Sequence, residues 1–388
     1  MASAYQLAVD SLLTEEMRLL RQTVREFAER EVRPQMMKYD EAQEFPVALV
    51  QRMADLGLLG AVIPVSLGGA GLTTMEFVVI MEELSRVDPS MGLILAAHSG
   101  LCLQHLAMFS SETQAAKYIP DLAAGKKIGS WCLTEPGSGS DAAGMRTVAT
   151  RDGAAYILDG SKTFITNGSY ASTFVVMAKT DTARGKSGIS AFVVEKGFGG
   201  ISIGRKENKL GMRASDTAQV IFEHVRIPRE NLLGSEGEGF RQALAVLEGG
   251  RVGIAALSVG LAQGAFEAAL AYAQQRQQFG KPIAEFQGIQ FSLADMATEI
   301  QAARLLTYRA AAAKVNGEPI TLLASQAKLF ASEVAQRVAT AAVQIHGGYG
   351  FTKDFPVEKF YRDVKLLTIG EGTSEVQKLV IAKSLIST

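Results

Sequence analysis

The chain of 388 residues has few cysteines and few histidines. Its two cysteines, Cys102 and Cys132, have no Cys-X-X-Cys partners, so the sequence predicts neither a disulfide framework nor a zinc site. The four histidines lack the spacing of a metal-binding helix motif, and we expect no metal. His98 and His105 lie two helical turns apart, where a satisfied core or surface role is favoured over metal ligation.

Neither sign of charge dominates, because 39 Lys and Arg stand against 40 Asp and Glu. This balance gives no electrostatic reason to expect a nucleic acid or an anionic membrane as partner. The apolar region 91–103 is broken by polar residues and is shorter than the roughly 20 residues of a spanning helix, so no membrane insertion is expected.

The N-terminal sequence MASAYQLAVDSLLTEE has neither a basic segment followed by an apolar one nor the composition of a transit peptide. Cysteines that form no disulfide framework also fit a reducing compartment. We therefore expect a cytoplasmic location in a bacterium, or the mitochondrial matrix if a eukaryotic transit peptide has been removed.

The first region of the chain, residues 1–126, has a helical pattern. Thr14 is a candidate N-cap, Thr73 with Glu76 fits a capping box, and Ser111 with Gln114 fits another. Pro46 is expected in the first turn of a further helix. With 47% hydrophobic residues the chain can bury a large core, and its length suggests two or three domains. We predict an N-terminal all-α domain here.

The composition and residue pattern of the sequence change twice after this region. Residues 127–236 are short segments rich in β-branched residues, and the dipeptides at 152–153, 159–160 and 167–168 predict tight turns of an antiparallel β-domain. Residues 237–388 return to helical segments at 239–275, 285–316, 320–345 and 373–386, which predict a four-helix bundle. The predicted fold is therefore α+β and multidomain.

Two motifs in the middle region combine glycine with polar or aromatic residues. Residues 132–144 (CLTEPGSGSDAAG) form a loop whose open backbone can approach a phosphate or a ring edge, although an ordinary Gly/Ser turn fits equally well. Its spacing is not a dinucleotide fingerprint, which argues against a NAD-dependent enzyme. Residues 162–168 (KTFITNG) place an aromatic at a strand end, where it can pack on a flat ring or lie in a plain half-buried strand.

Two further motifs lie near the C-terminus. Residues 344–351 (QIHGGYGF), followed by Asp354, Lys359 and Asp363, expose backbone at the end of a long helix, or are simply a C-cap and linker. Residues 369–375 (IGEGTSE) place Glu371 between two glycines before a capped helix, with Glu375 in its first turn. From these residues alone, a solvated loop acid is the favoured interpretation of Glu371.

Together the four motifs resemble the acyl-CoA dehydrogenase family over nearly the whole chain. The stretches 213–217 (RASDT), 247–251 (LEGGR) and 276–281 (RQQFGK) resemble it as well. The resemblance implies that family's fold and the FAD-dependent α,β-dehydrogenation of an acyl-CoA to the trans-2-enoyl-CoA. It also implies electron transfer to an electron-transfer flavoprotein. Because the family shares FAD between subunits, it implies a homotetramer built as a dimer of dimers.

The resemblance also assigns residues. Glu371 is implied as the catalytic base, with its own backbone N–H holding the thioester carbonyl. Contacts to the FAD of the same subunit are implied for Leu133, Thr134, Ser140, Phe164, Ile165, Thr166, Thr373 and Glu375. Contacts to the FAD of the neighbouring subunit are implied for Arg276, Phe279, Gln287, Gln344, Gly347 and Gly348. Acyl-CoA contacts are implied for Ser140, Glu248, Arg251, Gly370 and Gly372.

Some positions distinguish this chain within the resemblance. A subgroup of the family carries its base at the position of Gly250. Because this chain has glycine there and a carboxylate at 371, the resemblance indicates Glu371 as the base. Straight-chain members often have Tyr at the position of Gly370, and many members have Trp where this chain has Phe164. The missing phenol indicates a wider pocket, and the 247–251 context indicates a short-chain enzyme, so we expect a short or branched acyl group. An acyl-CoA oxidase using oxygen and a non-catalytic binding protein on the same fold remain alternatives.

Overall fold

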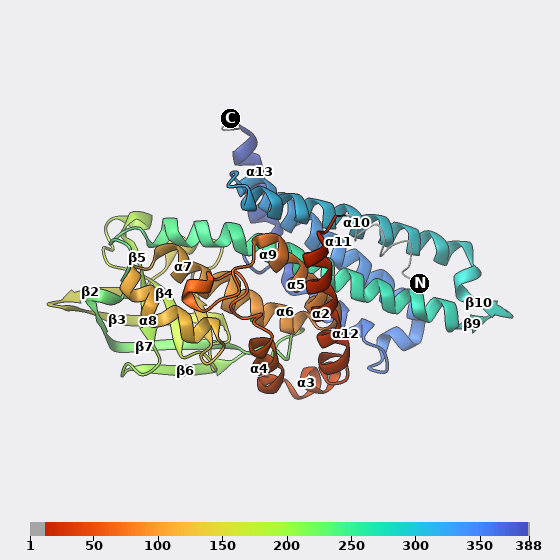
Figure 1. Ribbon diagram of the computed structural model, residues 1–388, viewed down its shortest axis with the longest axis horizontal. Coiled ribbons are helices and arrows are strands. Elements are labelled where there is room, and N and C mark those ends of the chain that lie inside the picture. The colour runs from red at the N-terminus through yellow and green to blue at the C-terminus, as the bar shows by residue number, and fades with distance from the viewer. Residues whose placement is uncertain (1–11, 387–388) are drawn as a thin grey trace. The chain divides into compact units, whose positions relative to one another are not determined.

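The structure is a computed structural model that describes residues 12–386 (Figure 1). The N-terminal stretch in which no targeting signal is expected lies outside the described residues as far as residue 11. The chain forms two compact units, each assembled from three separate stretches. The helical unit draws on residues up to 38, on 73–92 and on 252–368, and the β unit on 39–72, 93–251 and the residues from 369 onward.

The helical unit is built from long helices packed side by side. Its main elements are α2 (Glu15–Phe27), α5 (Thr74–Val87), the part of α9 (Gly239–Gln275) from Val252 onward, α10 (Gln287–Val315), α11 (Thr321–His346) and α12 (Val357–Asp363). Helix α10 packs against α11 and α5, and α2 packs against α5 (Figure 1). The hydroxyl of Thr14 accepts the N–H of Met17, and Thr73 with Glu76 forms a capping box, so both predicted helix starts are confirmed.

Buried charges join these helices. Arg304 on α10 donates to Glu82 on α5 at 2.7 Å, and both side chains are buried. Lys359 on α12 donates to Asp88 at 2.7 Å and to Asp363 at 2.5 Å. The polar residues that follow the QIHGGYGF motif therefore include a buried ion pair, which joins α12 to Asp88 at the end of α5.

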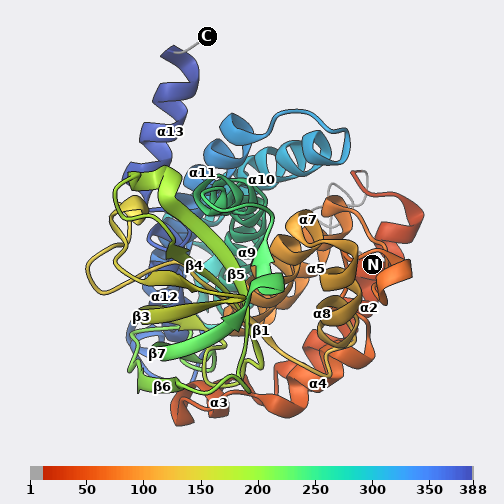
Figure 2. The same ribbon diagram turned by 90° about the vertical axis from the view of Figure 1, so that its left-hand side faces the viewer.

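The β unit contains an eight-stranded sheet of order β6-β7-β3-β2-β4-β5-β8, with β1 pairing beside β4. Figure 2 shows β6, β7 and β3 at one edge of this sheet. Most pairs are antiparallel, but β1 and β2 each pair parallel with β4. The strands are β1 (Gly129–Cys132), β2 (Val148–Asp152), β3 (Ala155–Thr166), β4 (Thr173–Lys179), β5 (Ile189–Glu195), β6 (Ile201–Lys206), β7 (Thr217–Pro228) and β8 (Leu232–Leu233).

The three glycine dipeptides have different outcomes. The turn at 152–153 joins β2 to its antiparallel neighbour β3, as predicted. The turn predicted at 159–160 is wrong, because Gly160 lies within β3, where pairing to β7 shifts register. A Cβ on Gly160 would lie 2.5 Å from Oγ1 of Thr147, which directly precedes β2, so close approach of a second chain segment explains this glycine. The dipeptide at 167–168 does form a turn, but it leads to β4, which does not pair with β3.

The β unit also contains helices. They include α4 (Val47–Asp55), α7 (Gln104–Phe109), α8 (Glu112–Ala123) and α13 (Ser374–Ile386), with the π-helical turn η3 (Ala96–Leu103). Side chains of η3 and α8, among them Leu103 and Ile119, share a core with Val175 and Met177 of β4. The capping box of Ser111 and Gln114 is confirmed at the start of α8. Pro46 is the N-cap of α4, one position before the first turn expected to hold it.

The four C-terminal helices predicted from the sequence are present as α9, α10, α11 and α13. Of these, α13 clusters with the β unit, while α10 and α11 belong to the helical unit. Two helical stretches, Pro89–Phe109 and Gly239–Gln275, are long and apolar enough to cross a membrane by length and composition alone. Both are mostly buried within the structure, and buried core helices pass the same test.

Candidate functional site

Glu371 lies in a short, tightly held loop before α13. Its backbone has a positive φ of 53° and Gly372 one of 97°, which is a left-handed path that a non-glycine residue follows only when its surroundings impose it. The buried amide of Gln377 donates from Nε2 to the carbonyl of Glu371 at 3.3 Å and to that of Gly372 at 3.0 Å. The hydroxyl of Thr373 accepts the N–H of Val376 and caps α13. Hydrogen bonds at the start of α13 therefore hold the loop.

The Glu371 carboxylate packs against α9. A Cβ built on Gly250 would lie 2.1 Å from Glu371 Oε2 and 3.0 Å from Leu101 Cδ2, so this glycine is what leaves room for the carboxylate. The residue is only partly exposed. The interpretation of Glu371 as a freely solvated loop acid, favoured from the local residues alone, is therefore wrong.

Two other predicted site residues belong to the same cluster. Arg251 follows Gly250 on α9 and is 5% exposed. Burial lowers the pKa of Arg251, while the charges of Glu371 and Glu248 oppose that shift. The three side chains thus form a carboxylate, guanidinium and carboxylate cluster in which the cation is largely removed from water.

A second group of predicted residues lies where β1 continues into the Gly/Ser loop beside β3. The N–H of Thr163 donates to the carbonyl of Thr134 at 2.9 Å, and Lys162 Nζ donates to the carbonyl of Leu133 at 3.0 Å. These bonds join the segment 133–134 directly to the segment 164–166. The fold therefore brings five residues predicted to contact the flavin into two adjacent segments of the chain, namely Leu133, Thr134, Phe164, Ile165 and Thr166.

Phe164 has unusual geometry within this group. The pairing of β3 with β7 shifts register between Lys162 and Ile165, and Phe164 sits in that bulge with φ +57°. Its ring is 64% exposed, whereas Ile165 beside it is 2% exposed. Three of the seven described non-glycine residues with positive φ are predicted site residues, namely Phe164, Phe279 and Glu371. Such strain concentrates at ligand sites.

The backbone of the Gly/Ser loop is accessible to a ligand at its glycines. Glu135 and Ser138 exchange backbone hydrogen bonds of 2.9 and 3.0 Å, which closes the start of the loop. A Cβ on Gly137 or Gly139 would meet nothing within 4 Å, and Ser140 is exposed. An exposed aromatic ring beside an open backbone loop fits the ring and polar edge of a flavin.

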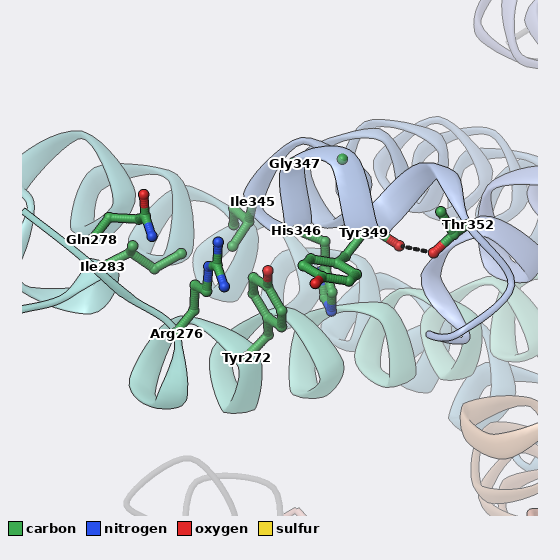
Figure 3. A pocket seen from close by; sticks show the side chains of 10 residues that line it. Tyr272, Arg276, Gln278, Ile283, Ile345, His346, Gly347, Tyr349 and Thr352 are labelled. Atoms are coloured by element: carbon green, nitrogen blue, oxygen red, sulfur yellow. Dashed lines mark hydrogen bonds between the residues drawn. The ribbon is translucent and has the colours of Figure 1, made fainter.

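The contacts predicted for the FAD of a neighbouring subunit lie in the helical unit, and three of them line a pocket of about 520 Å³ (Figure 3). Arg276 at the end of α9 places its guanidinium 5.6 Å from the centre of the Tyr349 ring, and Tyr272 stacks on His346 at 4.2 Å. Gly347 and Gly348 line the same pocket. A cation, aromatic faces and open glycine backbone suit a ligand that carries both phosphate and a flat ring.

Three predicted residues lie outside this pocket's lining. Phe279 is 93% exposed with φ +52°, and Gln287 at the start of α10 is exposed as well. Gln344 lines a neighbouring depression on α11 together with Arg337. These side chains remain accessible within the described chain, but the pocket brings together only Arg276, Gly347 and Gly348 of the predicted set.

Sequence reasoning missed three residues that hold these sites in place. Lys162 and Glu135 form a buried ion pair at 2.8 Å beside Leu133, and Gln377 supports the Glu371 loop. A lysine within an otherwise half-buried strand was the available signal, because a buried lysine requires a partner. Nothing in the sequence pattern distinguishes Gln377 from a surface glutamine on a helix.

The two histidines considered as ligands are core residues. His98 Nδ1 accepts the N–H of Gly129 at 2.9 Å, and its Nε2 lies 3.1 Å from the Leu122 carbonyl. His105 Nδ1 accepts the indole N–H of Trp131 at 3.0 Å. Burial lowers the pKa of each ring to about 4. The favoured core role is confirmed.

No cluster of histidine, cysteine and acidic side chains suited to a metal occurs within residues 12–386. The two cysteines, Cys102 and Cys132, are both buried as free thiols. Burial raises the pKa of the Cys102 thiol to about 12. Both are inert core residues rather than reactive groups.

Comparison with known proteins covers almost the full length. The acyl-CoA dehydrogenase N-terminal, middle and C-terminal domain profiles match residues 14–126, 130–225 and 237–386. The short-chain specific acyl-CoA dehydrogenase of Clostridium acetobutylicum is 49% identical over 96% of this chain and 99% of its own.

Two further proteins are similar over nearly the whole chain. CarC, a subunit of the caffeyl-CoA reductase-Etf complex of Acetobacterium woodii, is 44% identical over 96% of this chain and 99% of its own. The structure of butyryl-CoA dehydrogenase from Megasphaera elsdenii is similar with a TM-score of 0.95 at 41% identity, covering 96% of this chain and 99% of that one. The described fold of helical, β and helical domains agrees with that architecture.

Proposed function

The chain belongs to the acyl-CoA dehydrogenase family, and on that premise we propose that it oxidises a short or branched acyl-CoA to its trans-2-enoyl-CoA with Glu371 as the base. It is an oxidoreductase that acts on the Cα–Cβ bond of an acyl thioester. The observation that carries the assignment of the base is the position of the Glu371 carboxylate, packed on Gly250 beside the buried Arg251.

The chemistry requires a positioned base. The Cα–H next to a thioester is a very weak acid, so its removal needs a carboxylate held in place and a donor to the developing enolate oxygen. The loop that Gln377 and Thr373 fix supplies the carboxylate of Glu371 and, by our proposal, the backbone N–H of the same residue as that donor. An acyl chain closing over this loop expels water, which raises a carboxyl pKa and makes Glu371 a stronger base.

FAD is the proposed cofactor, since members of the family are flavoproteins. When bound, it supplies the two-electron acceptor for the hydrogen that leaves Cβ. We assign the same-subunit contacts to Leu133, Thr134, Ser140, Phe164, Ile165, Thr166, Thr373 and Glu375. The exposed Phe164 ring and the open 137–140 loop support this assignment.

Contacts to the FAD of a neighbouring subunit are assigned to Arg276, Phe279, Gln287, Gln344, Gly347 and Gly348. The residues assigned to the FAD of the same subunit all belong to the β unit, and the residues assigned to the FAD of the neighbouring subunit all belong to the helical unit. This division supports a cofactor shared between subunits. We accordingly propose a homotetramer built as a dimer of dimers. We also propose domain bounds of 1–126, 127–236 and 237–388, and a cytoplasmic location, or the mitochondrial matrix for a eukaryotic source.

The substrate proposal combines the site with the relatives. Gly370 places no side chain beside the base, and Ser140, Glu248, Arg251 and Gly372 complete the proposed acyl-CoA contacts. A short-chain specific relative and a butyryl-CoA dehydrogenase structure support a small acyl group. The similarity to CarC, which belongs to an Etf complex, supports an electron-transfer flavoprotein as the acceptor.

A spectrum of the purified protein tests this proposal. We expect flavin absorbance that bleaches anaerobically with butyryl-CoA or a short branched acyl-CoA, and much less with octanoyl-CoA. A panel in which octanoyl-CoA is the best substrate would overturn the substrate class, and a colourless protein that takes up no FAD would overturn the cofactor. Stopped-flow mixing of the reduced enzyme with air separates the oxidase alternative, because we expect slow reoxidation.

A further inference from the structure

Lys162 is buried in the middle of β3, next to the residues proposed to contact FAD. Its side chain has no exposed surface, and Glu135, its partner at 2.8 Å, is 6% exposed. Lysine is almost never fully buried without a partner, because removing its charge from water is unfavourable. The burial of this ammonium group therefore calls for a specific structural reason. The inference that follows rests on the proposed function, since it concerns the same cofactor edge.

The ammonium bridges two segments of chain. Its Nζ donates to the carbonyl of Leu133 at 3.0 Å and to Glu135 Oε1 at 2.8 Å, with Met145 Sδ at 3.9 Å. Immediately after Lys162, the Thr163 N–H donates to Thr134 O at 2.9 Å. Lys162 therefore joins the segment of Leu133 and Thr134 to the bulge that turns Phe164 outward.

Glu135 is itself fixed by backbone donors. Its Oε1 accepts the N–H of Thr147 at 2.9 Å, and its Oε2 accepts that of Arg146 at 2.5 Å. Burial would raise the pKa of Glu135, but the charge and hydrogen bond of Lys162 together with these backbone donors hold it below its ordinary value. The carboxylate thus keeps its charge and ties both ends of the 135–147 loop to Lys162.

Stability is a poor explanation for such a pair. Replacing a buried ion pair by apolar residues of similar volume is often neutral or stabilising, because removing two charges from water is costly. What apolar residues cannot supply is the donor to the Leu133 carbonyl. The specific contribution of Lys162 is therefore the position of the backbone that flanks the exposed Phe164 ring.

We infer that Lys162, oriented by Glu135, is a positioning residue that sets the backbone of Leu133 and Thr134 against the Phe164 bulge so that the two segments bind one flavin ring together. Lys162 acts through this backbone and takes no part in proton removal. Loss of a hydrogen bond from a charged donor weakens an interaction about tenfold or more, so FAD should dissociate at least that much more readily without it.

Three variants of the holoenzyme test the inference. Lys162→Met leaves Glu135 buried without its cation, and the double variant Lys162→Met with Glu135→Gln removes both charges while keeping an amide oxygen as an acceptor for the backbone N–H groups. Lys359→Met is the matched control, because Lys359 is also fully buried in an ion pair, but in the helical unit. Each variant is measured for the dissociation constant of FAD, the visible spectrum of the bound flavin and thermal stability.

We expect Lys162→Met to lose stability and to bind FAD at least about tenfold more weakly with a shifted spectrum. The double variant should regain stability but not FAD affinity, and Lys359→Met should lose stability with an unchanged spectrum. The inference is overturned if FAD affinity recovers together with stability in the double variant, or if Lys359→Met matches Lys162→Met in both flavin measurements. A wild-type protein that binds no FAD would instead refute the proposed function.

Discussion

A side chain at position 250 and the observed placement of the Glu371 carboxylate exclude each other. The Cβ of any residue other than glycine would stand 2.1 Å from Glu371 Oε2 and 3.0 Å from its Cδ. Packed cores do not absorb such an overlap without moving a side chain. The glycine on α9 and the acid in the loop before α13 therefore act as one unit, although 121 positions separate them.

Glu371→Gln tests the base. The amide keeps the size of the side chain but accepts no proton, so we expect turnover to fall by at least about 10²-fold while FAD remains bound. The measurement is kcat with a short acyl-CoA, together with flavin content from absorbance. Near-wild-type turnover would remove Glu371 from the mechanism.

Gly250→Ala tests whether the base needs this glycine. The new methyl group would displace the carboxylate, and we expect kcat to fall by about 10² or more with little change in flavin content. Gly253→Ala, on the same helix, is the matched control, because its Cβ would meet only a Phe77 carbon at 3.7 Å, an ordinary contact. Equal effects of the two substitutions would show that helix packing, not displacement of the base, is responsible.

Phe164→Ala tests the proposed flavin face. The ring is largely exposed and so contributes little to folding, whereas stacking on a bound ring contributes about 1 kcal/mol beyond buried area. We therefore expect FAD to bind roughly tenfold more weakly with thermal stability of the flavin-free protein nearly unchanged. Val65→Ala, at a surface position 73% exposed in the same unit, should change neither quantity. Undiminished affinity in the Phe164 variant would contradict the assignment.

The two core histidines predict a pH dependence of stability. Each ring has a pKa of about 4 when folded against 6.5 as the ordinary value, so the unfolded chain binds more protons between these pH values. Stability should rise with pH across this window, and each ring should account for on the order of 3 kcal/mol lost by pH 4. Denaturant unfolding at pH 7 and pH 4.5 measures this loss.

A His98→Asn variant supplies the comparison for that measurement. Asparagine does not titrate, so the free energy of unfolding should depend less on pH between 4.5 and 7 than it does in the wild type. The absolute stability of the variant is expected to be lower at pH 7, because the hydrogen bonds of His98 to Gly129 and Leu122 are not fully reproduced. An unchanged pH dependence would mean that His98 titrates normally in the folded protein.

Local sequence signals predicted the helices well. Capping residues such as Thr73 and Ser111 act over three positions, and the long helices carry their own periodicity. The β region was harder, because strand pairing joins residues far apart in the chain. The glycine at 160 illustrates this, since its neighbour Thr147 lies in another segment of the chain, directly before β2, and no local pattern distinguishes close approach from a turn.

The sequence by itself determined the family, the order of helical and β regions and the identity of the acid at 371, because these depend on residue type and short-range spacing. Only the tertiary structure decided that Glu371 is packed on Gly250 rather than solvated, and that Lys162 is buried against Leu133 and Glu135. The physical reason is that burial and close contact arise between segments brought together by folding. The free energy of those contacts cannot be predicted from the residues adjacent in the sequence.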